Sequence, residues 1–267
     1  MEENTKKSSA KKPVSKKPRD SELGLKLYYQ PIVQPMFGKT IGYEGLIRLI
    51  DKELRFVSPS VFIPIAEKSG LNAQLGTWVI EEGCRVINKM EKKGIEFEYV
   101  SVNVSPKHFA KKDFVPEMQR IIAEHKISAS KLCLEISELS LASKGGPTME
   151  KMSELQNIGF KIAIDDFGGE YAALSKLGSI PADILKLDKK FVDRIVIDPK
   201  SRDVTESIIE LAIKLNLEVV AKGIEDSIQQ KMLMQMGCHK MQGFLFGEPL
   251  RERDILNPKK KAADTEE

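Results

Sequence analysis

The sequence has few residues of the kinds that build disulfide frameworks or zinc sites. It contains only three cysteines, Cys84, Cys133 and Cys238, an odd number without CxxC spacing. This pattern predicts reduced, mostly packed thiols and excludes a disulfide-stapled scaffold. The three histidines are equally scattered, which is typical of surface or hydrogen-bonded positions and not of a metal centre.

The sequence also lacks long apolar runs. No stretch approaches the roughly 18 apolar residues of a membrane span, and the N-terminus has no apolar core of a secretory signal. We therefore expect a soluble, cytoplasmic protein. The net charge of +3 is small, and residues 1–20 carry seven Lys or Arg against three acids, so the basic character belongs to that segment.

Composition divides the chain into three parts. Residues 1–22 are rich in Lys, Ser and Pro, which is typical of a disordered tail, and residues 251–267 form a second charged tail. The basic tail could touch nucleic acid or an anionic membrane, but a solvated tail is the expected interpretation, and no nucleic-acid partner is expected. Residues 23–250 are left as one domain with a sizeable core.

Within this domain, short apolar runs rich in β-forming residues alternate with amphipathic segments. The runs, which predict strands, are residues 25–33, 41–49, 99–105, 131–137, 161–167, 183–188, 218–224 and 241–246. The segments, which predict helices from apolar residues three and four apart, are 58–70, 72–94, 115–125, 149–156, 205–215 and 228–236.

This alternation predicts parallel strands joined by crossover helices, an α/β fold. About eight strands in this length favour a closed (β/α)8 TIM-like barrel over an open doubly wound sheet. Only "QPMFGKT" separates the first two runs, which is typical of a hairpin. One strand of the barrel is therefore expected to be antiparallel.

Polar residues recur where the apolar runs stop. They are Glu44, Asn103, Glu135, Asp165, Asp166, Lys186, Lys222 and Gln242. In a β/α barrel such positions converge on one mouth. Several carboxylates gathered there suit a hard divalent cation such as Mg²⁺ or Mn²⁺, and Lys186 would add a positive charge against a phosphate oxygen or an attacking water. The residues thus indicate a metal site for phosphate chemistry.

The order and spacing of these motifs resemble the EAL domain family of bacterial cyclic di-GMP phosphodiesterases, from about Leu23 to Leu250. The matching stretches are "YYQPIV", "YEGLIRL", "FIPIAEKSGL", "VNVSPKHF", "LEISE", "IAIDDFGGEYAALSKL", "PADILKLDKKFV", "VVAKGIED" and "QGFLFGEPL". The resemblance implies an eight-stranded barrel with one antiparallel strand. It also implies binding of the second messenger cyclic di-GMP and, in active members, metal-dependent hydrolysis to pGpG.

The resemblance assigns a role to each matched residue. Metal ligands would be Glu44, Asn103, Glu135 and Asp165 for a first Mg²⁺ or Mn²⁺, and Asp165 and Asp166 for a second. Ligand contacts would come from Gln30, Glu44, Arg48 and Asp166. Lys186 and Gln242 would position the attacking water, while Glu138 and Glu225 would support loops. Arg48 suits a phosphate because guanidinium donates two parallel hydrogen bonds.

The sequence departs from the family pattern at three places. Position 45 is Gly where the E-A-L signature has Ala, a minor change because the Glu side chain supplies the ligand. Residues 165–171 read "DDFGGEY" where the family usually has D-D-F-G-T-G-Y. Because that loop shapes the metal site and a dimer contact in the family, Gly169 and Glu170 put activation and a homodimer in question.

The third departure is Lys222, which stands in "VVAKGIED" where the family reads V-V-A-E-G-V-E. The change replaces a glutamate that serves the second metal or acts as general base. A protonated lysine cannot bind a cation, whereas a pKa lowered by desolvation would leave a neutral amine base. We therefore expect a cyclic di-GMP receptor with impaired hydrolysis. An active phosphodiesterase and a protein-interaction module without ligand binding are the alternatives.

Overall fold

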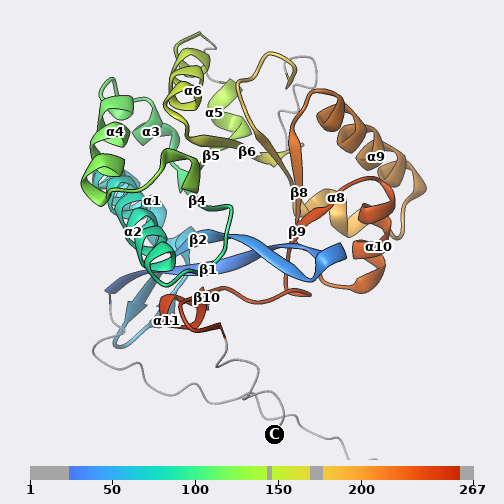
Figure 1. Ribbon diagram of the computed structural model, residues 1–267, viewed down its shortest axis with the longest axis horizontal. Helices are drawn as coiled ribbons and strands as arrows, with labels where there is room; N and C mark the ends of the chain where they lie inside the picture. Colours follow the sequence, from blue (N-terminus) through green and yellow to red (C-terminus); the bar gives the residue numbers. More distant parts are fainter. Residues whose placement is uncertain (1–23, 143–145, 169–176, 259–267) are drawn as a thin grey trace, which may run out of the picture.

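The structure, a computed structural model, describes residues 24–142, 146–168 and 177–258 of the chain (Figure 1). Eight strands form a closed barrel. They are β1 (Gly24–Gln34), β2 (Lys39–Asp51), β4 (Tyr99–Val104), β5 (Leu132–Ser137), β6 (Lys161–Phe167), β7 (Ile184–Leu187), β8 (Glu218–Lys222) and β9 (Lys240–Gln242). Neighbours from β2 through β9 run parallel, and β1 closes the ring by pairing antiparallel with both β2 and β9. The predicted barrel and its antiparallel strand are confirmed.

Helices surround the barrel (Figure 1). They are α1 (Pro59–Lys68), α2 (Asn72–Lys92), α3 (Pro106–Phe109), α4 (Phe114–His125), α5 (Glu138–Ala142), α6 (Gly146–Ile158), α8 (Lys189–Arg194), α9 (Pro199–Lys214), α10 (Ser227–Gln235) and α11 (Glu252–Ile255). The long helix α2 buries an apolar stripe in which Val79, Cys84 and Ile87 face the core. Within the described residues, no helix is long and apolar enough to cross a membrane.

The two-residue alternation of the strands sorts side chains between the barrel interior and the helix layer. Val100 and Val102 of β4 join the main core under the helices, whereas Tyr99 joins a second apolar cluster inside the barrel, with Cys133 and Ala163. Two residues further towards the carboxyl end, on the same face, Cys133 is followed by Glu135 and Ala163 by Asp165. The polar residues predicted for the site occupy this layer.

The last predicted strand is shorter than expected. The run "MQGFLF" predicts a strand over residues 241–246, but β9 ends at Gln242. At Gly243 the chain turns against the loop after β8, so closely that an added Cβ would lie 2.1 Å from the Ile224 carbonyl oxygen. Leu245 then donates its backbone N–H to the same oxygen at 3.1 Å. The strand prediction was wrong beyond Gln242 because this tertiary contact takes over the backbone.

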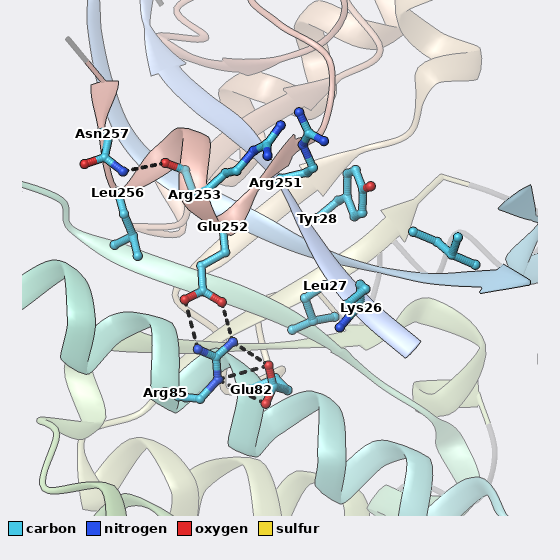
Figure 2. Close-up of a pocket in the computed structure, with 11 residues that line it drawn as sticks. Lys26, Leu27, Tyr28, Glu82, Arg85, Arg251, Glu252, Arg253, Leu256 and Asn257 are labelled. Atoms are coloured by element: carbon cyan, nitrogen blue, oxygen red, sulfur yellow. Dashed lines mark hydrogen bonds and ion pairs between the residues drawn. The ribbon is translucent and has the colours of Figure 1, made fainter. Parts of the chain in front are cut away.

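Packed structure also continues past the predicted domain end at residue 250. β10 (Leu250–Arg251) pairs with β1, and α11 places Ile255 in the core with 1% exposure. Arg85 of α2 donates to Glu252 through Nη1 at 2.9 Å and Nη2 at 2.5 Å (Figure 2). Charged residues at the start of the predicted C-terminal tail thus belong to the packed fold, because their carboxylates pair with α2. A short strand β3 (Arg55–Val57) pairs antiparallel with the carboxyl end of β2.

Candidate functional site

The strand ends bring a buried cluster of ionisable side chains together at the barrel mouth. Lys186 of β7 lies at its centre, with its ammonium 2.8 Å from Glu44 Oε2 and in contact with Glu135 Oε1. Gln242 donates Nε2–H to Glu44 at 2.7 Å, and Asn103 donates Nδ2–H to the other Glu44 oxygen at 3.1 Å. Glu44 therefore accepts three hydrogen bonds from three different strands.

Burial and charge shift the pKa values of this cluster. Burial alone would raise the pKa of Glu44, but the ammonium groups of Lys186 and Lys222 and the hydrogen bonds outweigh it and lower the pKa to about 2. Burial and the neighbouring charge of Glu44 raise the pKa of Glu135 to about 8, against the attraction of Lys186. Burial opposes the charge on Lys186, yet the surrounding carboxylates raise its pKa. Lys186 is thus a charged, buried centre.

A second cluster lies beside the first. Lys222, at the end of β8, places its ammonium 2.6 Å from Asp165 Oδ1 and 2.5 Å from Asp166 Oδ1. Its side chain is 19% exposed and Asp165 is buried, whereas Asp166 is 59% exposed. Burial and the nearby Lys186 oppose the charge on Lys222, but Asp165, Glu44 and Asp166 outweigh them and raise its pKa. These carboxylates therefore favour the charged form of Lys222, the opposite of the lowered pKa that a neutral amine base would need.

A break in β6 lets two consecutive carboxylates reach one ammonium. Successive strand residues normally point to opposite faces. Asp166, however, has a left-handed backbone with φ of 52°, and the β6–β7 register shifts between Ile164 and Phe167. This conformation is uncommon for a residue other than glycine and turns Asp166 back towards the mouth.

The donor types at the mouth suit a hard divalent cation, but their arrangement does not suit a pair of cations. Glu135 Oε2 is buried without a hydrogen-bond partner, which leaves one oxygen available as a ligand. The space between Asp165 and Asp166 is taken by the Lys222 ammonium. Among the described residues, no three acidic, histidine or cysteine side chains are gathered around a common point, as they would be in a site built from such ligands alone.

The remaining predicted residues lie around these clusters. Gln30 accepts from Gln242 at 3.1 Å, which joins it to the mouth. Glu138 accepts from the Gly168 backbone N–H at 3.2 Å, and Glu225 pairs with Lys189 at 3.1 Å, outside the mouth. Arg48 donates Nη1–H to the Ile47 carbonyl oxygen at 3.0 Å, and its guanidinium lies over the Phe56 ring. Gly169 and Glu170 lie outside the described residues.

Lys26 was not among the residues predicted for the site, although it lies four residues from Gln30 along β1. In the β1–β2 ladder Lys26 is paired with Arg48, as Gln30 is paired with Glu44. The predicted hairpin already implied that Lys26 shares a face of the strand with Gln30, because side chains two and four residues apart lie on the same face. Without the strand register, however, its partner could not be identified.

The fold and site thus define a β/α barrel with one antiparallel strand and a mouth of alternating carboxylates and lysines. Residues 18–249 match the model of the EAL domain, and the chain belongs to the EAL domain family.

Known relatives support this membership. The chain is 34% identical over 232 residues to the bifunctional diguanylate cyclase/cyclic di-GMP phosphodiesterase MucR of Pseudomonas aeruginosa, covering 87% of this chain and 34% of MucR. It is 34% identical over 231 residues to the oxygen sensor protein DosP of Escherichia coli, covering 86% of this chain and 29% of DosP. The chain therefore spans about a third of the length of these relatives.

Solved structures agree. The MucR phosphodiesterase in complex with c-di-GMP superposes with a TM-score of 0.82 at 34% identity, covering 86% of this chain and 94% of that one. The EAL domain of FimX from Pseudomonas aeruginosa, bound to c-di-GMP, has a TM-score of 0.77 at 18% identity, covering 86% of this chain and 91% of that one. At that identity the second likeness shows the fold alone.

Proposed function

We propose that this domain recognises cyclic di-GMP at the barrel mouth and acts as a receptor in second-messenger signalling, with hydrolysis to pGpG impaired. The observation that carries the proposal is the Lys222 ammonium between Asp165 and Asp166. The related MucR domain, whose structure is a c-di-GMP complex, supports the ligand. Gln30, Glu44, Arg48 and Asp166 would contact it.

The charge on Lys222 opposes catalysis in two ways. Two unit charges about 4 Å apart interact by roughly 4 kcal/mol at an effective dielectric of 20, so an ammonium strongly disfavours a divalent cation at the same carboxylates. A protonated lysine also cannot accept a proton, and loss of a general base commonly slows a reaction by about 10²- to 10⁴-fold. Both effects act on the reaction more than on binding of an anionic ligand.

Phosphodiesterases of the EAL family are metal-dependent. In this chain Glu44, Asn103, Glu135 and Asp165 would hold one Mg²⁺ or Mn²⁺, which would polarise a phosphate oxygen and activate water. Lys186 would hold the charge of a phosphate oxygen, and Gln242 would orient the water. The second position, at Asp165 and Asp166, is the one that Lys222 opposes.

An active phosphodiesterase is the alternative, because Lys186 and Gln242 lie together with Glu44 in the buried cluster. If the site keeps one cation and the Lys222 ammonium moves towards solvent, slow turnover would survive. A protein-interaction module that binds no nucleotide is the remaining reading, and the retained ligand-side residues speak against it.

The experiment that tests the proposal measures pGpG formation from cyclic di-GMP with excess Mg²⁺ or Mn²⁺, for the wild type beside Lys222→Glu. We expect little product from the wild type and at least a hundredfold more from the variant. Lys92→Glu, an exposed site at the far end of α2, makes the same charge change and should behave as the wild type.

Calorimetric titration of the wild type with cyclic di-GMP completes the test. Binding without product supports the receptor. Rapid wild-type turnover would establish an enzyme instead, and absence of both binding and turnover would leave the interaction module.

A further inference from the structure

A cavity opens where β10 leaves the side of β1. The β1–β10 ladder ends with the pair Tyr28 and Arg251, because the chain turns into α11 at Glu252. Continued by two residues along each strand, the same register would place Lys26 opposite Arg253. Both of these side chains line a cavity of about 500 Å³ (Figure 2). This volume lies in the range of small-molecule binding sites.

The cavity is separate from the barrel mouth and follows an open strand edge. Within the described residues, none of the side chains predicted for the mouth lines it. Lys26 and Leu27 point to opposite faces of β1, yet both line the cavity, so it reaches around the edge of the strand. On this edge residues 24–27 have no strand partner in the described part of the chain. Their backbone therefore adds hydrogen-bonding groups to the cavity wall.

Basic side chains outnumber acidic ones on the cavity wall. The basic ones are Lys26, Arg85, Arg251 and Arg253, and the acidic ones are Glu82 and Glu252. Arg85 pairs with both of these carboxylates, at 2.6 and 2.5 Å. Arg253 shares Asp254 with Arg251, at 3.5 and 3.3 Å. Lys26 has no hydrogen bond or ion pair within residues 24–142, 146–168 and 177–258. Lys26 and Arg253 therefore leave positive charge for an incoming anion.

An aromatic ring and aliphatic side chains complete the wall. Tyr28 is two residues from Lys26 on β1, so its ring lies on the same strand face, about 7 Å along the strand (Figure 2). Leu27, Ile50 and Leu256 add apolar surface. A flat ring can stack on a tyrosine, and a compact anion can accept hydrogen bonds from a lysine and an arginine. The cavity thus suits a molecule with an anionic group and a flat ring about 7 Å apart.

We infer that this cavity binds a nucleoside monophosphate, with the phosphate between Lys26 and Arg253 and the base against the ring of Tyr28. The inference goes beyond the proposed function, because the cavity and the mouth would be occupied independently. A phosphate monoester carries about two negative charges and three terminal oxygens, so it can accept from an ammonium and a guanidinium at once. One sugar unit then bridges the distance to the base. Cyclic di-GMP has no phosphate monoester and is not the ligand expected here.

The test is a calorimetric titration of the full chain with GMP, with and without excess cyclic di-GMP, for the wild type, Lys26→Met and Arg253→Met. We expect one GMP per chain, with an affinity that cyclic di-GMP does not change. Loss of one charge-assisted hydrogen bond should weaken GMP binding about tenfold in each variant and make its salt dependence shallower. The control Lys231→Met removes an exposed charge of α10 and should bind GMP as the wild type does. Guanosine, which lacks the phosphate, should bind the wild type and both variants equally weakly.

The outcomes separate this cavity from the mouth. No saturable GMP binding to the wild type, or equal GMP affinity in the wild type and both variants, overturns the inference. Displacement of GMP by cyclic di-GMP would place GMP at the mouth and also overturns it. The melting temperature without ligand identifies a variant that is misfolded, and the other variant then decides. Absence of cyclic di-GMP binding overturns the proposed function alone, because the GMP titrations are interpreted without it.

Discussion

At the scale of single residues, Lys222 places its ammonium against both carboxylates at the end of β6, Asp165 and Asp166. The ammonium of Lys186 has the same relation to Glu44 and Glu135. The mouth therefore contains four carboxyl groups and two lysine amino groups within contact distance. A glutamate at position 222 would make the same site more negative by two charges.

This charge balance predicts how the protein responds to metal. Replacing Lys222 with Met leaves Asp165 buried without its partner, which should lower the free energy of unfolding by about 3 kcal/mol in EDTA. Saturating Mg²⁺ should restore much of this loss, because the cation takes the position of the ammonium. Urea denaturation with and without Mg²⁺ measures both effects.

The wild type should change little on addition of Mg²⁺, and Lys92→Met serves as the matched control. Equal stabilisation of the wild type and Lys222→Met by Mg²⁺ would show that Lys222 does not compete with cations.

Residue-level geometry was only partly predictable. That the polar residues at the strand ends share one mouth followed from the alternation of strands and helices. The sequence pattern could not predict that Asp165 and Asp166 both reach Lys222, because strand alternation assigns neighbouring side chains to opposite faces. The left-handed conformation of Asp166 is set by the register break with β7, a tertiary feature that the local sequence does not reveal.

At the scale of elements, α11 is fixed to α2 by Glu252, which accepts from Arg85 and from Lys89. Hydrogen bonds from Arg85, helped by Lys89 and opposed by burial, lower the pKa of Glu252 to about 2. A carboxyl whose folded pKa lies below its unfolded value contributes stability above the unfolded pKa, about 4.5, and loses it as the pH falls through the folded pKa.

Glu252→Gln should therefore be less stable than the wild type by about 1 to 2 kcal/mol at pH 7, after discounting for the partly exposed carboxylate. The difference should shrink as the pH falls from about 4.5 towards 2. Urea denaturation across this range checks the prediction, with the exposed Glu154→Gln as control. A difference independent of pH would mean that the pair with Arg85 does not set the pKa of Glu252.

Element prediction succeeded where one signal was sufficient. Long amphipathic segments such as α2 and β-branched runs such as β4 were found from periodicity alone. Short elements were missed: β10 and α11 carry too few residues for a pattern and exist because Ile255 and Glu252 pack against the rest of the fold. The prediction of the last strand was too long for the same reason. The backbone at Gly243 is set by its close contact with Ile224 and not by local strand propensity.

At the scale of the whole molecule, the closed barrel couples the mouth to the helix layer. Each barrel strand is hydrogen-bonded to two neighbours, and β1 joins β2 to β9. The single tryptophan, Trp78, belongs to α2 and packs against the main core. It therefore reports on the helix layer, while far-UV circular dichroism reports on all helices and strands.

Because β1 closes the barrel by pairing with both β2 and β9, ligand binding at the mouth should stabilise the helix layer as much as the strands. At a free cyclic di-GMP concentration of 100 times Kd, mass action raises the free energy of unfolding by about 2.7 kcal/mol. Trp78 fluorescence and circular dichroism should give coincident urea transitions without ligand, and both should shift together with it. If the ligand shifts the circular dichroism transition but not the Trp78 fluorescence transition, the mouth and the helix layer unfold as separate units. Binding would then stabilise only the strands that touch the ligand.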